Sequence, residues 1–312
     1  MKQMRTRCLP SMTNHEVEEY LKRSDIIIIP VGVAEMHGAY PLDCEYVMAE
    51  AYARLIAEQV DGLVLPNLVY FHPGATQIGR GTVHMSMENG FRYVTAIAES
   101  LLQQGFRRQI YIPGHQPTSQ FLLPLITEFF DNNKVPLFYL DMMAYLVANG
   151  KMEPLSFEAM RQPQILSTPE RMGDHAKWIG SYKICGRIND FPTGAEANDP
   201  ESLAGANDPE EGQKALFRLL ASRPTLLSCS PAFYYTHCSD HGSAPLPQTR
   251  EEIEREGEIG EKWMRDQIDS CDFVSLFEDL KIVDKYMNKE IMEKHGDHLP
   301  RNKWSPNVSK EV

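Results

Sequence analysis

The first half of the chain alternates short β-branched runs with longer amphipathic segments. The apolar run Ile26 to Val31 ends in Pro-Val-Gly and is typical of a buried strand in a parallel sheet. Good helix formers with one apolar stripe follow at Glu45 to Val60, which predicts a helix that stops near Gly62. Two further strands are predicted, one within Leu63 to Tyr70 and one at Gln109 to Pro113.

The remaining elements of this half complete the alternation. Helices are predicted at 90–104 and in a segment that runs to Asp131, and a fourth strand is predicted at Pro136 to Met142. A short helix at Asn14 to Arg23, capped by its first residue, precedes the first strand. The β-α-β-α order over residues 26–142 predicts an α/β fold with right-handed crossovers and a parallel sheet.

The second half has a less regular pattern. Thr168 to Tyr182 predicts a helix that is capped by its first residue, and Arg250 to Ile268 predicts a charged amphipathic helix. Residues 190–212 predict a loop, and we expect the polar tail after Val283 to fray or to wrap around a neighbouring chain. We divide the chain into three parts: an N-terminal arm with a short helix at 1–23, a main α/β domain at 24–275 and a polar tail at 276–312.

Composition narrows the class of protein. The chain has 312 residues, with 42% hydrophobic and 24% charged side chains, which are ordinary values for a globular protein. Its net charge of -12 argues against a nucleic-acid surface, which needs a basic stripe. No window approaches the ~18 apolar residues of a membrane span, and the first residues lack the apolar core of a signal peptide. The six cysteines form no C-x-x-C pair. We therefore expect a cytoplasmic protein.

Metal-capable side chains follow two of the predicted strands. Glu35 and His37 come after the first strand, with Asp43 and Glu45 close behind, and His115 follows the third strand. In open α/β sheets, ligands bind at the carboxyl ends of the strands. This edge is therefore the predicted site of the chemistry. The same spacing also suits a buried histidine satisfied by a carboxylate, with two acids on the surface.

Two other segments carry histidines. The Gly-rich segment 71–89 holds His72 and His84 and predicts a long loop over the same edge of the sheet. Residues 232–244 hold His237, Asp240 and His241. An H-x-x-x-H spacing places two nitrogens on one face of a helix, but the neighbouring Ser, Asp and Gly favour a loop there.

The opening stretch resembles the creatininase (creatinine amidohydrolase) family. That family shows a strand followed by Pro-Val-Gly, Glu-x-His-Gly, Pro-Leu and an acid that opens a helix. The matching residues here are Pro30-Val31-Gly32, Glu35-Met36-His37-Gly38, Pro41-Leu42 and Glu45. Later landmarks follow in the same order: Gly81-Thr82, Gly114-His115, Asp174-His175-Ala176, and the loop and helix from Gly242 to Met264. The resemblance covers roughly residues 24–275.

This resemblance implies a three-layer α/β/α domain with a two-metal site that hydrolyses non-peptide C–N bonds, usually in a hexamer. The family's metal ligands map onto Glu35, His37, Glu45 and His115. A carboxylate between two divalent ions ~3.5–4 Å apart can bridge them, and the ions share and activate a water. Mixed histidine and carboxylate ligands suit zinc, manganese or iron.

The sequence also departs from the family pattern. In the family, the bridging acid is usually an Asp that lies one residue farther along the chain. The acid that aligns with it here is Glu45. Asp43 is either a rival ligand or the helix N-cap. Pro117 stands where the family has a ligand, and the family's Glu after His-Ala-Gly is missing at 179–181. The site therefore holds one or two metals. Three residues are candidate substitutes for the missing ligands: His237, Asp240 and His241.

Three functions remain open. The first is a hydrolase of a C–N bond in a small cyclic amide or formamide, acting by metal-activated water, with Glu45 and His175 as catalytic residues. Its candidate substrate-binding residues are His72, His84, Trp178 and His241. The second is a single-metal lyase or isomerase of a small polyol or keto compound. The third is an inactive family member that serves as an assembly subunit, which the retained ligand residues argue against. In each case we expect a homo-oligomer, a hexamer by the resemblance.

Overall fold

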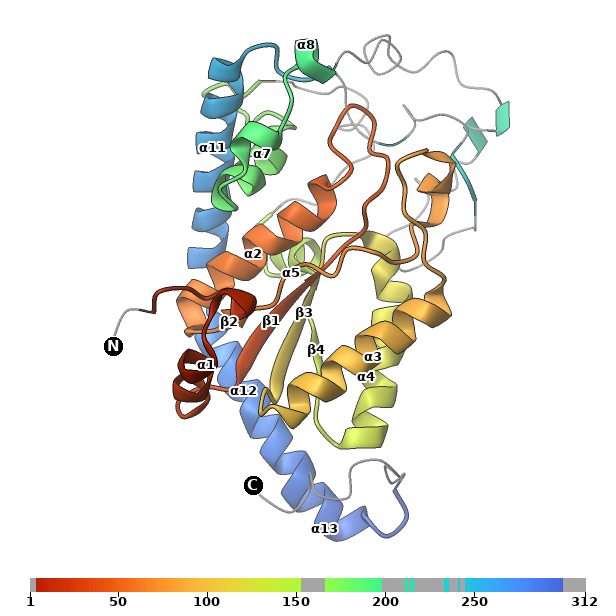
Figure 1. Cartoon of the computed structure of the whole chain (residues 1–312), viewed down its shortest axis with the longest axis vertical. Coiled ribbons are helices and arrows are strands. Elements are labelled where there is room, and N and C mark those ends of the chain that lie inside the picture. The colour runs from red at the N-terminus through yellow and green to blue at the C-terminus, as the bar shows by residue number, and fades with distance from the viewer. Residues whose placement is uncertain are drawn as a thin grey trace.

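Among the described residues, four strands form one parallel sheet. The computed structural model describes residues 4–152, 166–197, 211–212, 214–215, 233–235, 241 and 245–299. The strand order is β2-β1-β3-β4 (Figure 1). The strands are β1 (Ile26–Val31), β2 (Leu63–Val64), β3 (Arg108–Pro113) and β4 (Phe138–Tyr139). The central strands β1 and β3 pair along their whole length. The predicted α/β fold with a parallel sheet is confirmed.

Helices cover both faces of the sheet, which gives three layers. Successive side chains of a strand point to opposite faces. Ile26 and Ile28 pack with α2 (Cys44–Val60), α7 (Ala176–Ile184), α11 (Arg250–Asp269) and α12 (Phe273–Tyr286). Ile27 and Ile29 pack with α1 (Asn14–Leu21), α3 (Met87–Gln103) and α4 (Ser119–Asn133). Figure 1 shows α2 and α3 on opposite sides of the strands.

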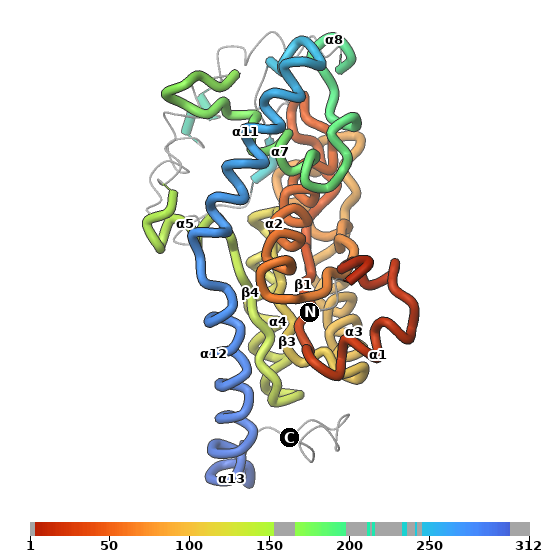
Figure 2. Tube along the Cα trace, turned by 90° about the vertical axis from the view of Figure 1, so that its left-hand side faces the viewer, coloured from red at the N-terminus to blue at the C-terminus, as the bar shows by residue number. Residues whose placement is uncertain are grey.

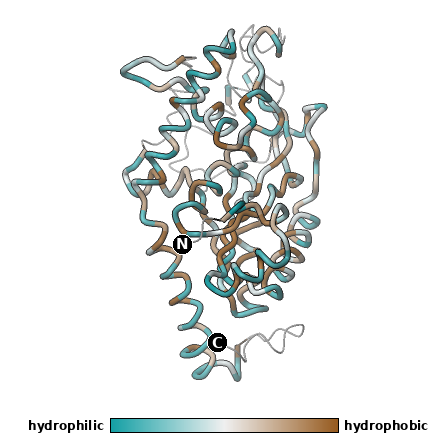
Figure 3. The backbone as a smooth tube through the Cα atoms, turned by 60° about the vertical axis from the view of Figure 1, so that its left-hand side comes forward, coloured by the Kyte–Doolittle hydropathy of each residue, from teal (hydrophilic) through white to brown (hydrophobic). Residues whose placement is uncertain are grey.

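Short elements complete the described chain. The short α-helices are α5 (Met142–Ala148), α8 (Gly194–Ala197) and α13 (Met292–His295). Single 3₁₀ turns lie at Leu9–Ser11, Gly74–Ile78, Gln116–Thr118 and Ile188–Asp190, and a π-turn lies at Met287–Ile291. All six residues of β1 are buried, because helices cover both of its faces. Hydrophobic positions gather around the sheet (Figure 3). No helix in the described part of the chain is long and apolar enough to cross a membrane.

Two glycines let α7 and α11 touch along their backbones. A methyl group on Gly260 would lie 1.8 Å from the carbonyl oxygen of Ala176, and one on Gly180 would lie 2.4 Å from the carbonyl carbon of Gly260. Neither position tolerates a side chain without moving a helix. This contact sets the position of α7. The helix begins directly after His175 and thereby holds its first residues near the edge of the sheet.

Two predicted helix starts are wrong. The N-cap of α1 is Thr13, which forms a capping box with Glu16, and Asn14 is the first helical residue. The helix predicted from Thr168 begins only at Ala176 as α7. The buried carboxylate of Glu256 accepts hydrogen bonds from the backbone and hydroxyl of Ser167, at 2.9 and 2.5 Å. These bonds hold the preceding segment in turns.

Two predicted strands are shorter than expected. The second strand ends at Val64, just before Pro66, although Leu68 still forms an isolated bridge with Val31. Proline has no N–H group for the ladder, so it ends regular pairing. The fourth strand ends at Tyr139, because the carboxylate of Asp141 caps α5 by accepting from the Ala144 N–H at 3.0 Å.

The expected frayed tail is helical as far as His295. Helix α12 continues through the π-turn into α13 and runs away from the sheet (Figure 2). Asp284 anchors α12 to the rest of the protein, because its two carboxylate oxygens accept hydrogen bonds from the guanidinium group of Arg107 at 2.8 and 2.9 Å. Residues after Leu299 lie outside the described residues. The division at residues 23 and 275 stays a prediction.

Candidate metal centre

The sheet topology places the ends of β1 and β3 side by side. From β1 the chain goes to β2 on one side, and it later adds β3 on the other side. The crevice at such a switch point is where open α/β sheets bind ligands. Glu35 and His37 follow β1, and His115 follows β3. Three predicted metal ligands therefore share one edge of the sheet.

Close backbone approaches hold the loop after β1 in place. A methyl group on Gly32 would lie 2.4 Å from Cβ of Tyr46 in the first turn of α2, so only glycine fits there. The N–H of Glu35 donates to the carbonyl of Leu42 at 3.0 Å, and the Thr76 hydroxyl donates to Oε2 of Glu35. The Glu35 side chain is buried, with 1% of its surface exposed. Its carboxylate is therefore fixed before any ligand binds.

Glu45 and His115 meet because β3 ends against the start of α2. A methyl group on Gly114 would lie 2.2 Å from the carbonyl oxygen of Glu45, so this glycine permits the approach. Nδ1 of His115 then lies 2.7 Å from Oε2 of Glu45 and 3.1 Å from Oε1 of Glu35. His115 thus faces both carboxylates.

His241 joins the cluster from a distant segment. One ligand atom from each of Glu35, His37, Glu45 and His241 lies within 4.8 Å of the others. Nε2 of His241 is 3.5 Å from Oε1 of Glu35, and Nδ1 of His37 is 3.7 Å from Oε1 of Glu45. The two carboxylate oxygens of Glu45 therefore face different histidines, with Oε2 toward His115 and Oε1 toward His37. This is the geometry that a bridging carboxylate needs.

The cluster fits a divalent metal. Oε1 of Glu35, Nδ1 of His37 and Nε2 of His241 are buried, and no described residue forms a hydrogen bond with them. A buried polar group without a partner costs about 1–3 kcal/mol, so three converging atoms of this kind need a shared ligand. Carboxylates mixed with imidazoles suit zinc, manganese or iron.

Burial and mutual charge shift the pKa values in the cluster. Burial raises the pKa of Glu45, and the Glu35 carboxylate raises it further. Burial alone would lower the pKa of His115, but Glu45 and Glu35 outweigh it and raise this pKa to about 10. Burial, followed by the neighbouring His241, lowers the pKa of His37 well below its ordinary value. Without metal, a protonated His115 therefore balances the carboxylates.

Asp43 has a different partner from Glu45. Its carboxylate accepts hydrogen bonds from the Tyr182 hydroxyl and, at 2.6 Å, from Arg187. Asp43 stands at the N-cap position of α2, but its side chain makes no capping hydrogen bond. Asp43 therefore takes the predicted N-cap position, but its carboxylate binds α7 and the turn after it instead of capping α2.

His175 lies beside the cluster behind Tyr40. It is fully buried, and its Nδ1 is 2.5 Å from the Tyr40 hydroxyl. The Tyr40 ring lies 5.4 Å from the ring of His37, and the Trp178 ring lies 5.2 Å from it. Burial lowers the pKa of His175 to about 4. Tyr40 and Trp178 therefore form an aromatic wall next to His37.

His72 and His84 pair with each other, with ring centroids 5.7 Å apart. His72 is half-buried and His84 is exposed, and neither belongs to the four-residue metal group. His237 and Asp240, two of the three candidate substitute ligands, lie outside the described residues. Of the three, the structure places His241 at the cluster.

Three residues at or near this site were not predicted from the sequence. Tyr40 contacts His175, Thr76 holds Glu35, and Lys177 lies over the ring of Trp178. Tyr40 falls between His37 and Glu45, so its place in the opening stretch was a usable signal. Thr76 lies in the segment 71–89 that was predicted to cover this edge of the sheet, and Lys177 lies between the predicted site residues His175 and Trp178.

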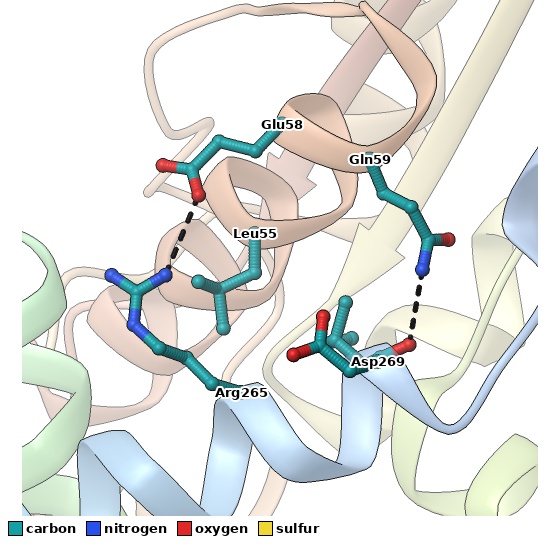
Figure 4. A pocket seen from close by; sticks show the side chains of 6 residues that line it. Leu55, Glu58, Gln59, Arg265 and Asp269 are labelled. Carbon is teal, nitrogen blue, oxygen red and sulfur yellow. Dashed lines mark hydrogen bonds and ion pairs between the residues drawn. The ribbon is translucent and has the colours of Figure 1, made fainter.

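A separate pocket of about 250 Å³ lies between α2 and α11 (Figure 4). Leu55 and Arg265 are among its lining residues, and Arg265 pairs with Glu58 at 3.4 Å. Ten or more residues of α2 separate this pocket from Glu45, which is about 15 Å along a helix. The pocket is therefore not part of the metal cluster.

A model of the creatininase family, described as creatinine amidohydrolase, matches residues 10–181. That range is more than half of the chain and holds the opening motifs, His115 and His175. The chain belongs to the creatininase family. The resemblance inferred from the opening stretch is thereby confirmed, although His241 lies outside the matched range.

Two curated proteins are similar to part of this creatininase-family chain. The 3-dehydro-scyllo-inosose hydrolase of Thermotoga maritima is 29% identical over 146 residues, which is 46% of this chain and 46% of that protein. The creatinine amidohydrolase of Pseudomonas putida is 26% identical over 119 residues, or 36% of this chain and 46% of that protein. The chain spans about half the length of each of these relatives.

Solved creatininases share the fold. A crystal structure of creatinine amidohydrolase has a TM-score of 0.54 and 18% identity, and covers 85% of this chain and 97% of its own. A putative creatinine amidohydrolase from Bacteroides fragilis has a TM-score of 0.54 and 16% identity, with 89% and 97% covered. A manganese form of creatininase has a TM-score of 0.52 and 17% identity, with 85% and 98% covered.

Proposed function

We propose that this member of the creatininase family is a metal-dependent hydrolase that attacks the carbonyl group of a small substrate and cleaves a C–N bond. The observation that carries the proposal is the buried cluster of Glu35, His37, Glu45, His115 and His241. Its atoms converge, and three of them have no hydrogen-bond partner among the described residues. The family membership and the names of the two curated relatives, both hydrolases, support the reaction class.

The histidine ligands divide into two sets that share the two carboxylates. His115 lies toward Oε2 of Glu45, and His37 and His241 lie toward Oε1. Oε1 of Glu35 is 3.1 Å from His115 and 3.5 Å from His241. We infer that His241 takes the place of the ligand that is missing at Pro117. Divalent ions held there would polarise a carbonyl group and lower the pKa of a water molecule. The two sets therefore favour two metals per chain.

Tyr40 and His175 are our candidates for moving a proton. Their hydrogen bond of 2.5 Å joins the Tyr40 hydroxyl to a histidine that has no other role in the site. A pKa of about 4 keeps His175 neutral at pH 7, but it also makes His175 a weak base. His175 therefore suits the role of orienting Tyr40 and taking up a proton transiently. The half-buried Trp178 would contact the substrate.

A keto compound is the second candidate substrate. The curated relative with the longer match is named 3-dehydro-scyllo-inosose hydrolase, which is a hydrolase of a keto-polyol. Hydrolysis beside a ketone would begin with the same addition of water to a carbonyl carbon. The neighbouring C–C bond would then break, which leaves a carboxylate and a carbon that takes up a proton. The alternative lyase or isomerase of a small polyol or keto compound would use a single metal. The number of metal ions per chain therefore distinguishes it from the hydrolase.

Metal content and hydrolysis together test the proposal. The protein is reconstituted with zinc, manganese or iron and analysed for metal per chain. It is then incubated with cyclic amides, formamides and keto-inositols while acid release and products are followed by NMR. We expect two metals per chain and one carboxylate formed per bond cleaved. One metal with isomerised or dehydrated products would favour the lyase or isomerase. Absence of metal from the folded protein would favour an inactive assembly subunit.

A further inference from the structure

Lys177 places a cation beside the metal cluster. It is the second residue of α7, and helical side chains lean toward the N-terminus, which here is the end nearest His175. Its Nζ lies 5.1 Å from the centre of the Trp178 ring, and that ring lies 5.2 Å from His37. The ammonium is close enough to His37 to lower its pKa, and Glu45 is close enough to act on Lys177 in turn.

No anion of the described chain pairs with this ammonium. Lys177 is partly buried, yet its Nζ makes no ion pair or hydrogen bond to any described residue. Asp174 is the strongest of the acids that act on it, but the Asp174 carboxylate bonds to Arg171 at 3.1 Å. A desolvated cation without an anion is costly, so its contact with Trp178 compensates it only in part.

The charge balance of the site points to an anionic ligand. One divalent ion would cancel the charges of Glu35 and Glu45, and Lys177 would then leave a surplus of positive charge. A second ion would enlarge that surplus. Water and neutral amides do not offset such a charge, whereas a carboxylate does so with two strong acceptor oxygens.

We propose that Lys177 is an anion-binding residue of the active site and that its ligand is a carboxylate next to the metal centre. The inference rests on the proposed function, because water that cleaves the C–N bond of an amide, or a C–C bond beside a ketone, leaves a carboxylate. The same group can also be present on the substrate from the start. In the second case Lys177 selects for a substrate that already carries this charge.

The test measures acetate binding to the metal-loaded protein by calorimetry, with acetamide as the neutral counterpart. K177M and K177Q remove the charge, and K177R keeps it. K183M is the matched control, because Lys183 lies on the same helix but pairs with Glu254 at 3.4 Å. We expect K177M and K177Q to weaken acetate binding at least tenfold, with acetamide binding unchanged. K177R and K183M should stay within about threefold of the parent.

Metal content and melting temperature, measured on each variant, separate binding from folding. Because K177M removes an unpaired charge, we expect it to melt at or above the temperature of the parent. A lower melting temperature, or acetate binding equal to that of the parent at equal metal content, overturns the inference. Loss of acetate binding without any detectable hydrolysis would uphold Lys177 and reject the proposed reaction.

Kinetics then locate the carboxylate. If the substrate carries it, K177M raises KM for an amide with a carboxylate group and leaves KM for the neutral amide unchanged. If the carboxylate arises in the product, K177M relieves inhibition by acetate with both substrates. An unchanged KM together with unchanged inhibition overturns the inference.

Discussion

At the residue scale, Asp43 and Glu45 show how near neighbours take different tasks. Both are acids at the start of α2, and spacing alone leaves either one as the ligand. The structure separates them, because Tyr182 and Arg187 occupy Asp43 while Glu45 faces Glu35 and His115. Tyr182, Arg187 and His115 lie 70 or more residues from these acids in the sequence, so local patterns do not reveal the pairings.

We predict that Glu45→Gln loses at least one metal per chain, whereas Asp43→Asn keeps all of it. Glutamine cannot bridge two ions as a carboxylate does. Asparagine at position 43 weakens only the pair with Arg187, which is 36% exposed, and such pairs contribute about 1 kcal/mol or less. Elemental analysis of both variants is the measurement. A metal-free Asp43→Asn beside an unaffected Glu45→Gln would show that the wrong acid has been assigned.

We predict that His241→Ala lowers the metal content from two ions per chain to one. Its Nε2 is buried, makes no hydrogen bond to a described residue and lies 3.5 Å from Oε1 of Glu35. The exposed His84 provides the control, and His84→Ala should keep both ions. If His241→Ala binds as much metal as the parent, His241 contacts substrate or is a bystander.

We predict that the buried His175 makes the free energy of unfolding fall at acidic pH. Its pKa is lowered by burial to about 4 in the folded protein and rises to its ordinary value on unfolding. The stability is therefore complete above about pH 6.5 and is lost as pH falls through about 4, at about 1.4 kcal/mol per unit. We expect His175→Gln to flatten this part of the profile, measured by denaturant unfolding at pH 7, 5.5 and 4.5. The exposed His15 gives the control variant His15→Gln. Equal slopes for the parent and His175→Gln would contradict the prediction.

At the element scale, the sequence predicts best where local patterns decide. The bounds predicted for the first strand are those of β1, and the predicted helix at Glu45 to Val60 begins one residue late. The hydrophobic period and the turn signals suffice there. The start of α7 was predicted too early, because it depends on the hydrogen bond between Ser167 and Glu256, which lie 89 residues apart.

We predict that Gly260→Ala disrupts both the stability and the site. The added methyl group would overlap the Ala176 carbonyl oxygen at 1.8 Å, so α7 must shift and carry Lys177 and Trp178 with it. Overpacking of this kind costs about 3 kcal/mol or more. Denaturant unfolding measures the loss, and the exposed Glu258 on the same helix gives the control Glu258→Ala. A Gly260→Ala protein as stable as the parent would mean that the two helices do not touch as described.

At the scale of the whole molecule, the site combines separate parts of the chain. The ends of β1 and β3 supply Glu35, His37 and His115, and parallel topology alone predicted that these meet. The positions of His175 and Trp178 depend on how the second half of the chain packs onto α2. That packing follows from close glycine contacts and long-range hydrogen bonds, which a one-dimensional pattern does not contain.

The outer face of α12 bears on the prediction of a homo-oligomer. Val274, Ile282 and Tyr286 are spaced by multiples of four residues, so they share one side of the helix, and they are 49%, 62% and 49% exposed. The helix also runs away from the sheet (Figure 2). Exposed apolar patches of this kind mark contact surfaces. A second copy of this chain would bury the stripe.

We predict that the protein assembles into a homo-oligomer, a hexamer by the family resemblance, and that α12 contributes to its contacts. Light scattering at micromolar concentration should give a mass several times the 35.5 kDa of one chain. Ile282→Glu places a charge in the apolar stripe and should lower that mass, whereas Lys281→Glu, one residue away and 45% exposed, should not. A parent mass near 35.5 kDa would reject the oligomer. An oligomer that Ile282→Glu leaves intact would place its contacts on another surface.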